Sequence, residues 1–175
     1  MKTLIYLFAI VMLIFAGCAK DEMFDENSNN LELKKAKVPI PMKAEFCMNP
    51  NMEAGFILIE GLDPANPQSY LPKEGWISGH ATHMGEIIME ESPTTFVSAA
   101  VTPMGVKTVS EGKITAANGD YYLFSATSYS FPDRSFTGEV YMYNGTGKFE
   151  GMTGTVIMTG SGSCWSAEGT MSYKK

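Results

Sequence analysis

Apolar and polar residues alternate along most of the chain from residue 42 onward, and turn residues interrupt the alternation at short intervals. In the segment 43–48, for example, Ala44 and Phe46 alternate with Glu45 and Cys47. A period of two is typical of strands that turn one face toward a core. The pattern predicts strands over Lys43–Met48, Gly55–Glu60, Trp76–Glu90, Thr94–Val101, Thr108–Ala116, Tyr121–Ser128, Phe136–Tyr143, Thr153–Thr159 and Cys164–Tyr173. Such a series predicts an all-β fold, an antiparallel barrel of about eight strands that is closed or nearly closed.

Glycines mark the expected turns of this barrel. Asn118-Gly119 stands between two predicted strands and favours a tight hairpin, in which both residues adopt a positive φ. Asn144-Gly145 predicts a second hairpin turn in the same way. Gly79 and Gly85 lie inside the long strand predicted over 76–90, where we expect them to act as bending points.

The N-terminal segment has a different pattern. An apolar run over residues 4–15 follows Lys2 and ends in Ala16-Gly17-Cys18. The run is shorter than the roughly 20 residues that a membrane-spanning helix needs. It resembles a bacterial lipobox, which implies a signal peptide over residues 1–17, cleavage before Cys18, and attachment of lipid, palmitate included, to the Cys18 sulfur. This resemblance predicts a membrane lipoprotein.

Residues 18–41 are polar and rich in Asn, with no apolar periodicity, and they predict a flexible tether before a β-barrel domain over residues 42–175. Lys20-Asp21-Glu22 resembles the signal that exports some lipoproteins to the outer face of the outer membrane. An ordinary charged linker is the alternative. The expected localisation is therefore the outer membrane, through a lipid anchor, with exposure on the cell surface as an open question.

Length and charge restrict the classes of function. Removal of the 17 signal residues from 175 leaves 158, enough for one domain, with 12 basic and 19 acidic residues and a net charge of −7. Phosphate repels such a chain, and no run of Lys or Arg offsets the repulsion. Nucleic acid is therefore not expected as a partner.

Two of the three cysteines remain once Cys18 carries lipid, and export favours their oxidation. Cys47 shares its strand face with Glu45, and Cys164 shares its face with Glu168, so both are expected to point outward. In an up-and-down barrel with an even number of strands the first and last strands are neighbours. A Cys47–Cys164 disulfide across that seam is one prediction, and two free thiols are the alternative.

Three glycine-containing motifs carry a family resemblance. The segment 145–154, Gly-Thr-Gly-Lys-Phe-Glu-Gly-Met-Thr-Gly, the segment 79–85, Gly-His-Ala-Thr-His-Met-Gly, and the segment 117–120, Ala-Asn-Gly-Asp, resemble motifs of bacterial relatives of the allene oxide cyclase and dirigent barrels, which are calycin-like. The resemblance implies a barrel fold. It carries no activity, because no catalytic position of the plant enzymes matches a residue in this chain.

Residues of other catalytic classes do not form recognisable sets. His80, His83 and Glu86 have ligand side chains, but on a regular strand His83 faces opposite to the other two, so no metal site is expected. Gly-Thr-Gly-Lys lacks the spacing of a phosphate loop, and no serine-hydrolase or Cys-His signature is present. No cofactor is therefore expected.

Aromatic and apolar residues gather on the inward faces of two predicted strands and form either a packed core, the favoured interpretation, or the wall of a ligand pocket. The candidate pocket residues are His83, Tyr122, Phe124, Trp165 and Met171.

The sequence supports two hypotheses for the function. The preferred one is a non-catalytic module that binds a small apolar ligand or another envelope protein. The alternative is an isomerase or cyclase whose interior pocket uses His83 as acid or base.

Overall fold

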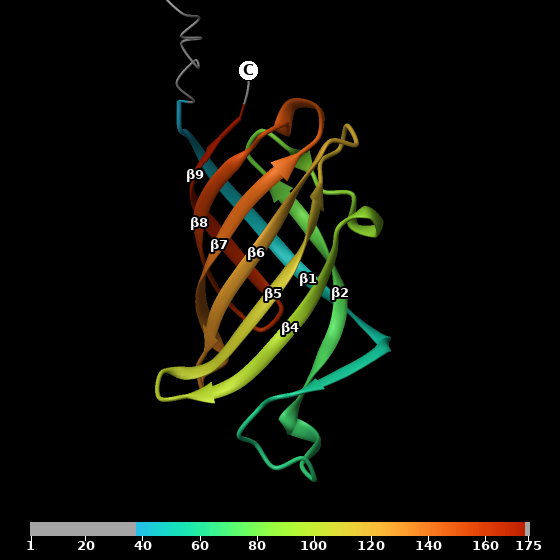
Figure 1. Ribbon diagram of the computed structural model, residues 1–175, viewed down its shortest axis with the longest axis vertical. Coiled ribbons are helices and arrows are strands. Elements are labelled where there is room, and N and C mark those ends of the chain that lie inside the picture. The colour runs from blue at the N-terminus through green and yellow to red at the C-terminus, as the bar shows by residue number, and fades with distance from the viewer. Residues whose placement is uncertain (1–37, 174–175) are drawn as a thin grey trace, which may run out of the picture. The chain divides into compact units, whose positions relative to one another are not determined.

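The computed structural model describes residues 38–173, which form one antiparallel sheet of nine strands with three short 3₁₀ helices (Figure 1). The strands are β1 Ile40–Leu58, β2 Tyr70–Ala81, β3 Gly85–Glu86, β4 Pro93–Thr102, β5 Gly105–Thr115, β6 Tyr121–Ser130, β7 Ser135–Gly145, β8 Thr153–Ser161 and β9 Cys164–Ser172, and the 3₁₀ helices are η1 Pro67–Ser69, η2 Met89–Glu91 and η3 Gly147–Phe149. Within this part of the chain no helix is long and apolar enough to cross a bilayer.

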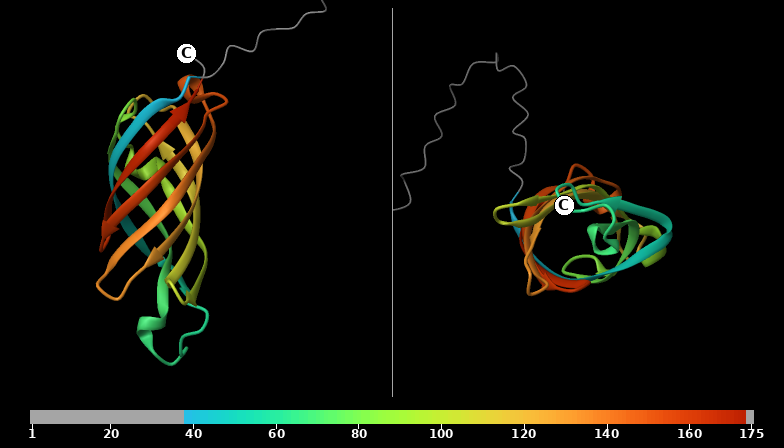
Figure 2. Two further views of the ribbon diagram at one scale, coloured as in Figure 1. Left: turned by 90° about the vertical axis from the view of Figure 1, so that its left-hand side faces the viewer. Right: turned by 90° about the horizontal axis from the view of Figure 1, so that it is seen from below.

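Eight of the strands close a ring. Neighbours in the ring follow the chain from β4 to β9, and β1 pairs with both β9 and β2. Figure 2 shows the ring from the side and from below. The predicted barrel is therefore confirmed, including the pairing of its first and last strands. The shortest stretch of paired residues in the ring is the one between β2 and β4, where Glu74–Trp76 pair with Pro93–Thr95.

The first strand is longer than expected. Segments 43–48 and 55–60 were predicted as separate strands, but β1 runs continuously through Ile40–Leu58 and is irregular between Asn51 and Phe56. It begins two residues before the expected domain start at residue 42 and includes Pro41. The signal peptide, Cys18 and most of the expected tether lie outside the described residues.

The prediction of one bent strand over 76–90 is wrong. The chain leaves β2 at Ala81, turns back, and pairs β3 with the end of β2. Gly79 has a φ of 131°, Gly85 a φ of 74°, and His83 between them a φ of 68°. Gly79 stays within β2, where it pairs with Phe46 of β1, and Gly85 begins β3. The reversal therefore falls in the turn over residues 82–84, where His83 has left-handed backbone that cannot continue an extended strand.

The hairpin at Asn118-Gly119 is confirmed, because β5 and β6 pair on either side of it. Its turn differs from the expected type: Gly119 has a φ of 86° but Asn118 does not have a positive φ. The Gly119 N–H donates to the Ala116 carbonyl, and the Ala116 N–H donates to the Asp120 carbonyl. This arrangement is a three-residue loop with a left-handed glycine, which is the next commonest hairpin connection.

Asn144-Gly145 is not the hairpin turn that the sequence suggests. Tyr122 pairs with Gly145 and Leu123 with Tyr143, so Asn144 is the extra residue of a bulge at the end of β7. Its φ of 43° fits the tolerance of Asn for the left-handed region. The chain then passes through η3 before β8 begins.

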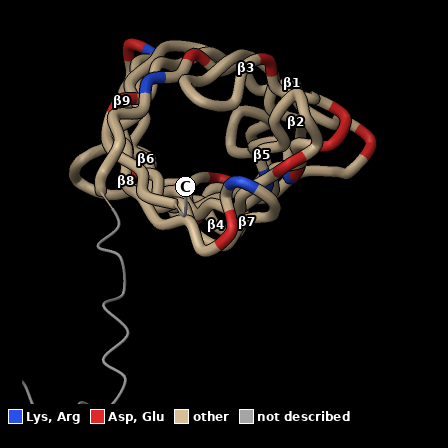
Figure 3. Tube along the Cα trace, turned by 90° about the horizontal axis from the view of Figure 1, so that it is seen from above, with Lys and Arg blue, Asp and Glu red and all other residues tan. Residues whose placement is uncertain are grey.

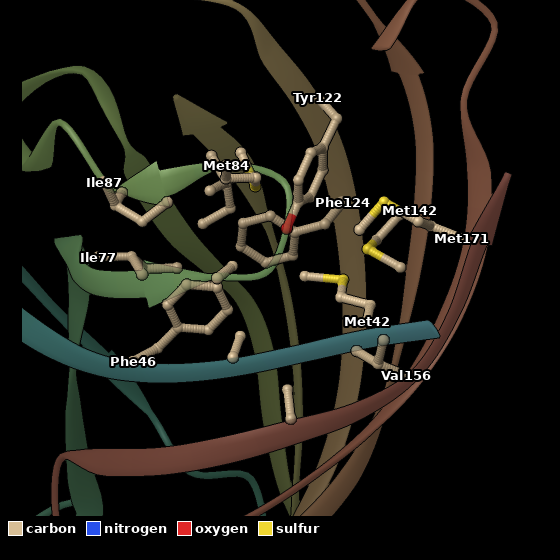
Figure 4. Packing of buried hydrophobic residues seen from close by; sticks show 14 of the residues in the cluster. Met42, Phe46, Ile77, Met84, Ile87, Tyr122, Phe124, Met142, Val156 and Met171 are labelled. Carbon is tan, nitrogen blue, oxygen red and sulfur yellow. The ribbon is translucent and has the colours of Figure 1, made fainter. Parts of the chain in front are cut away.

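The core occupies one end of the barrel, where inward-facing residues from most strands meet. Figure 4 shows their side chains converging from β1, β2, β6, β7, β8 and β9. Those with 2% exposure or less are Met42, Ile114, Ala116, Tyr122, Met142, Phe149, Met152, Ala167 and Met171. We call this end the closed end. Burial of so many large side chains there supplies the main stabilisation of the sheet.

Inward-facing glycines make room for the large side chains of that core. A Cβ atom on Gly112 would lie 2.7 Å from the Phe124 ring, and one on Gly154 would lie 2.8 Å from the Met142 methyl group. Any larger residue at these positions would displace a core side chain. The glycines therefore allow long side chains to cross the interior of a narrow barrel.

Candidate functional site

The barrel interior beyond the closed end holds a cavity of about 330 Å³. Its inner part is lined by Ile114, Tyr122 and Met142, and its outer part by residues such as Pro72 and Ser163. This volume falls in the range of small-molecule sites in proteins. The interior is thus core at one end and cavity at the other, whereas the sequence favoured a fully packed interior.

We call the end of the barrel opposite the closed end, where the cavity opens, the mouth. The turns between β4 and β5, β6 and β7, and β8 and β9 surround it, and the connection between β1 and β2 projects beyond it (Figures 1 and 2). β1 begins and β9 ends at the closed end, where Ile40 pairs with the buried Met171 (Figure 1). Both ends of the described chain therefore leave the barrel away from the mouth.

One wall of the cavity is aromatic. Phe46 on β1 and Phe136 on β7 both meet the Trp165 ring on β9 edge to face, with centroid separations of 5.9 and 6.2 Å. Edge-to-face contacts of this kind hold the rings in fixed orientations. Methionines Met48 and Met158 extend the same wall. Such a surface suits an apolar ligand.

A second wall carries hydroxyl groups. Thr108 and Ser110 on β5 and Ser128 and Ser130 on β6 all line the cavity, because alternate residues of a strand face the same side. The Thr108 and Ser128 hydroxyls hydrogen-bond to each other at 2.6 Å. Among residues 38–173, the structure gives no side-chain hydrogen bond for Ser110 or Ser130. These two hydroxyls can therefore bond to a ligand.

Tyr122 supplies a polar group at the inner end of the cavity. Its side chain is 2% exposed and packs edge to face on Phe149, with ring centroids 5.8 Å apart. Figure 4 shows its oxygen pointing into the barrel interior beside Phe124. Within the described residues its hydroxyl has no hydrogen-bond partner. Burial raises the pKa of Tyr122 far above its ordinary value, so the hydroxyl stays a neutral donor.

Charged side chains lie on the barrel exterior. None of the described residues that line the cavity is Asp, Glu, Lys, Arg or His. Figure 3 shows acidic and basic positions interspersed around the ring. On the outer face, Lys43 of β1 and Glu168 of β9 form an ion pair at 3.0 Å, with both side chains well exposed. The cavity is therefore an uncharged compartment within an acidic protein.

His83 does not belong to the cavity, so its selection as a pocket residue is wrong. It is exposed, lies on the turn after β2, and its ring is 6.4 Å from that of Tyr173. Its carbonyl accepts a hydrogen bond from the Lys148 side chain. The prediction failed because it continued the alternation of β2 through residue 83, where the positive φ reverses the chain.

The other histidine is also exposed. His80 pairs with Glu86 across β2 and β3, while His83 lies on the turn between these strands. In residues 38–173 no group of three or more His, Cys, Asp or Glu side chains is placed to hold a metal ion.

Three of the predicted pocket residues, Tyr122, Phe124 and Trp165, line the cavity. Met171, which is 1% exposed, instead packs in the core of the closed end. The hydroxyl wall and Phe136 are not among the predicted pocket residues. The alternation on β5, β6 and β7 gives their inward direction, but small hydroxyl side chains carry no sequence signal that separates a cavity wall from an ordinary strand face.

Cys47 and Cys164 form a disulfide on the outer face of the barrel. Each cysteine neighbours an aromatic residue of the cavity wall, Phe46 or Trp165. The third cysteine, Cys18, lies outside the described residues.

No family model, no curated protein and no solved structure matches this chain.

Proposed function

We propose that the protein is a lipid-anchored module of the cell envelope whose barrel binds a small apolar molecule without catalysing a reaction. The observation that carries the proposal is the cavity of about 330 Å³, open at the mouth and lined mainly by apolar side chains. The proposed anchor at Cys18 and the outer-membrane location derive from the resemblance of residues 1–18 to a lipobox.

The composition of the cavity favours binding over catalysis. The isomerase or cyclase alternative relied on His83 as acid or base, and His83 lies on an exposed turn. A general acid or base works best with a pKa near the operating pH, and burial moves the pKa of Tyr122 away from neutrality. Binding in the cavity needs neither group to exchange a proton.

Titration with a fluorescent apolar probe tests the proposal. N-phenyl-1-naphthylamine is uncharged and becomes fluorescent in apolar surroundings. We expect saturable binding of one probe per molecule by the full chain carrying Cys18→Ser, which has no lipid of its own. Ser128→Phe places a ring in the cavity and should weaken binding at least about tenfold, because the apolar surface of the site is then already covered.

Thr127→Phe is the matched control, because Thr127 neighbours Ser128 on β6 but pairs with Val109 and Glu139 on the outer face. It should leave probe binding unchanged. Ser110→Phe, with Glu111→Phe as its outer-face control, repeats the comparison on β5 in case one variant fails to fold. Absence of saturable binding, or equal binding by all folded variants, would contradict the proposal.

A further inference from the structure

The polar groups of the cavity specify a class of ligand within the proposed function. We propose that the cavity selects uncharged, elongated molecules in which an apolar skeleton carries a neutral oxygen that accepts a hydrogen bond from the Tyr122 hydroxyl. This inference rests on the proposed binding function and adds the chemistry of the ligand.

The uncharged lining argues against ionised ligands. Transfer of a carboxylate or an ammonium group from water into an apolar site is costly unless an opposite charge or several hydrogen bonds compensate. No described residue that lines the cavity carries a charge of either sign. A charged ligand would therefore have to leave its charged group outside the mouth, while a neutral ligand can be buried completely.

Tyr122 offers a hydrogen-bond donor to the cavity. No fully buried side-chain nitrogen or oxygen among the described residues lacks a partner, so the Tyr122 oxygen, which has none, is open to the cavity rather than sealed in the core. A ligand that displaces water from this hydroxyl must accept its hydrogen bond, because a donor left unpaired beneath an apolar group is costly. The Tyr122 hydroxyl lines the cavity, and no described residue accepts a hydrogen bond from it. A carbonyl, ether or alcohol oxygen at the inner end of the cavity would complete the bond. The raised pKa keeps this group a donor at neutral and mildly alkaline pH.

The arrangement of the walls gives the ligand its shape. Tyr122 and Ser130 are eight residues apart on β6, which is about 26 Å of extended strand, and both line the cavity. The Thr108 and Ser128 hydroxyls between them bond to each other, which leaves Ser110 and Ser130 as further polar contacts. The aromatic wall at Phe46 and Trp165 provides the apolar contact. The ligand is therefore long, with polarity at separated points.

Displacement of N-phenyl-1-naphthylamine tests the selectivity with ligands of equal chain length. The competitors are 1-decanol, 2-decanone, decanoate and decylammonium at neutral pH, where the last two are charged. We expect the two neutral compounds to displace half of the probe at concentrations at least about tenfold lower than the charged ones, because of the cost of burying an unpaired charge.

Tyr122→Phe tests the role of the hydroxyl. The probe has no oxygen, so its affinity should not change, whereas the affinity for 2-decanone should fall about three- to tenfold, the effect of one hydrogen bond. Tyr121→Phe is the control, because Tyr121 is the neighbouring residue and its ring lies on the outer face beneath Lys113. It should bind 2-decanone as the parent protein does.

The outcomes separate the two proposals. If the probe binds and Ser128→Phe blocks it, but decanoate competes as well as 1-decanol or Tyr122→Phe binds 2-decanone normally, the inference on ligand class is wrong and cavity binding stands. If the folded protein does not bind the probe at all, both are wrong.

Discussion

Cys47 on β1 and Cys164 on β9 are directly opposite each other in the register of the two strands that close the barrel, with Cα atoms 4.1 Å apart, and they form a disulfide. The bond lies on the outer face at the mouth end of the seam, close to the aromatic wall. It joins two residues that are 117 positions apart in the sequence and so encloses most of the barrel.

Removal of this bond should lower the stability of the barrel. Replacement of both Cys47 and Cys164 by Ala releases a loop of more than a hundred residues, for which the chain-entropy estimate is a loss of about 5 kcal/mol in the free energy of unfolding. Urea denaturation of the oxidised protein and of the double variant measures the difference. Either single variant should lose a similar amount, since each lacks the bond.

Counting reactive thiols checks independently that the Cys47–Cys164 bond is present. Denatured but unreduced Cys18→Ser protein should contain no reactive thiol. Two reactive thiols, or a loss of stability below about 1 kcal/mol in the double variant, would contradict the disulfide as a stabilising feature of the native barrel.

Gly79 should be the glycine least tolerant of substitution. Its φ of 131° is open to glycine alone, and an added Cβ atom would overlap the Glu45 carbonyl oxygen of the paired strand. We expect Gly79→Ala to lower the free energy of unfolding by about 3 kcal/mol or more. Gly119→Ala at the β5–β6 hairpin should lose about 1 to 2 kcal/mol, because Gly119 has a positive φ but open space around it. Equal losses in urea denaturation would refute the steric argument.

Local sequence patterns determined the directions of side chains wherever the backbone stayed extended. The alternation around Phe46 and Phe124 predicted inward positions, and the same rule placed Cys47 and Cys164 outward, on strands that the up-and-down order makes neighbours. The rule failed at His83, because a single positive φ ends the alternation and no motif before it signalled a reversal.

The cavity could not be predicted in the same way. Alternation tells which residues point inward, but the volume left between them depends on the register of strands far apart in the sequence and on the tilt of the barrel. Met171 and Trp165 both point inward from β9, yet one fills the closed end and the other lines the cavity. Their depth along the barrel axis decides between these roles.

The proposed lipid anchor makes a prediction about residues outside the described region. Cys18→Ser should abolish incorporation of labelled palmitate and move the protein from the membrane fraction to the soluble fraction. Stable anchoring requires more than one acyl chain, and the variant lacks the residue to which the lipid is proposed to attach. Cys47→Ala is the control and should still incorporate the label. A Cys18→Ser protein that stays in the membrane fraction, with the parent protein unlabelled, would refute the lipoprotein assignment.

Burial of Tyr122 should make the barrel sensitive to alkali. Its folded-state pKa lies above the value of 10.0 expected for the unfolded chain, so the unfolded state releases the proton first. The contribution of Tyr122 is therefore complete below pH 10 and declines as the pH rises, by up to about 1.4 kcal/mol per pH unit. Urea denaturation at about pH 9 and pH 11 should show a steeper loss of stability for the parent protein than for Tyr122→Phe, which has no phenol to ionise at that position.

Tyr121→Phe is the control and should show the same pH dependence of stability as the parent protein. Parallel pH profiles for the parent protein and Tyr122→Phe would mean that the Tyr122 hydroxyl ionises as readily in the barrel as in the unfolded chain, and its assignment as a buried neutral donor would then be wrong.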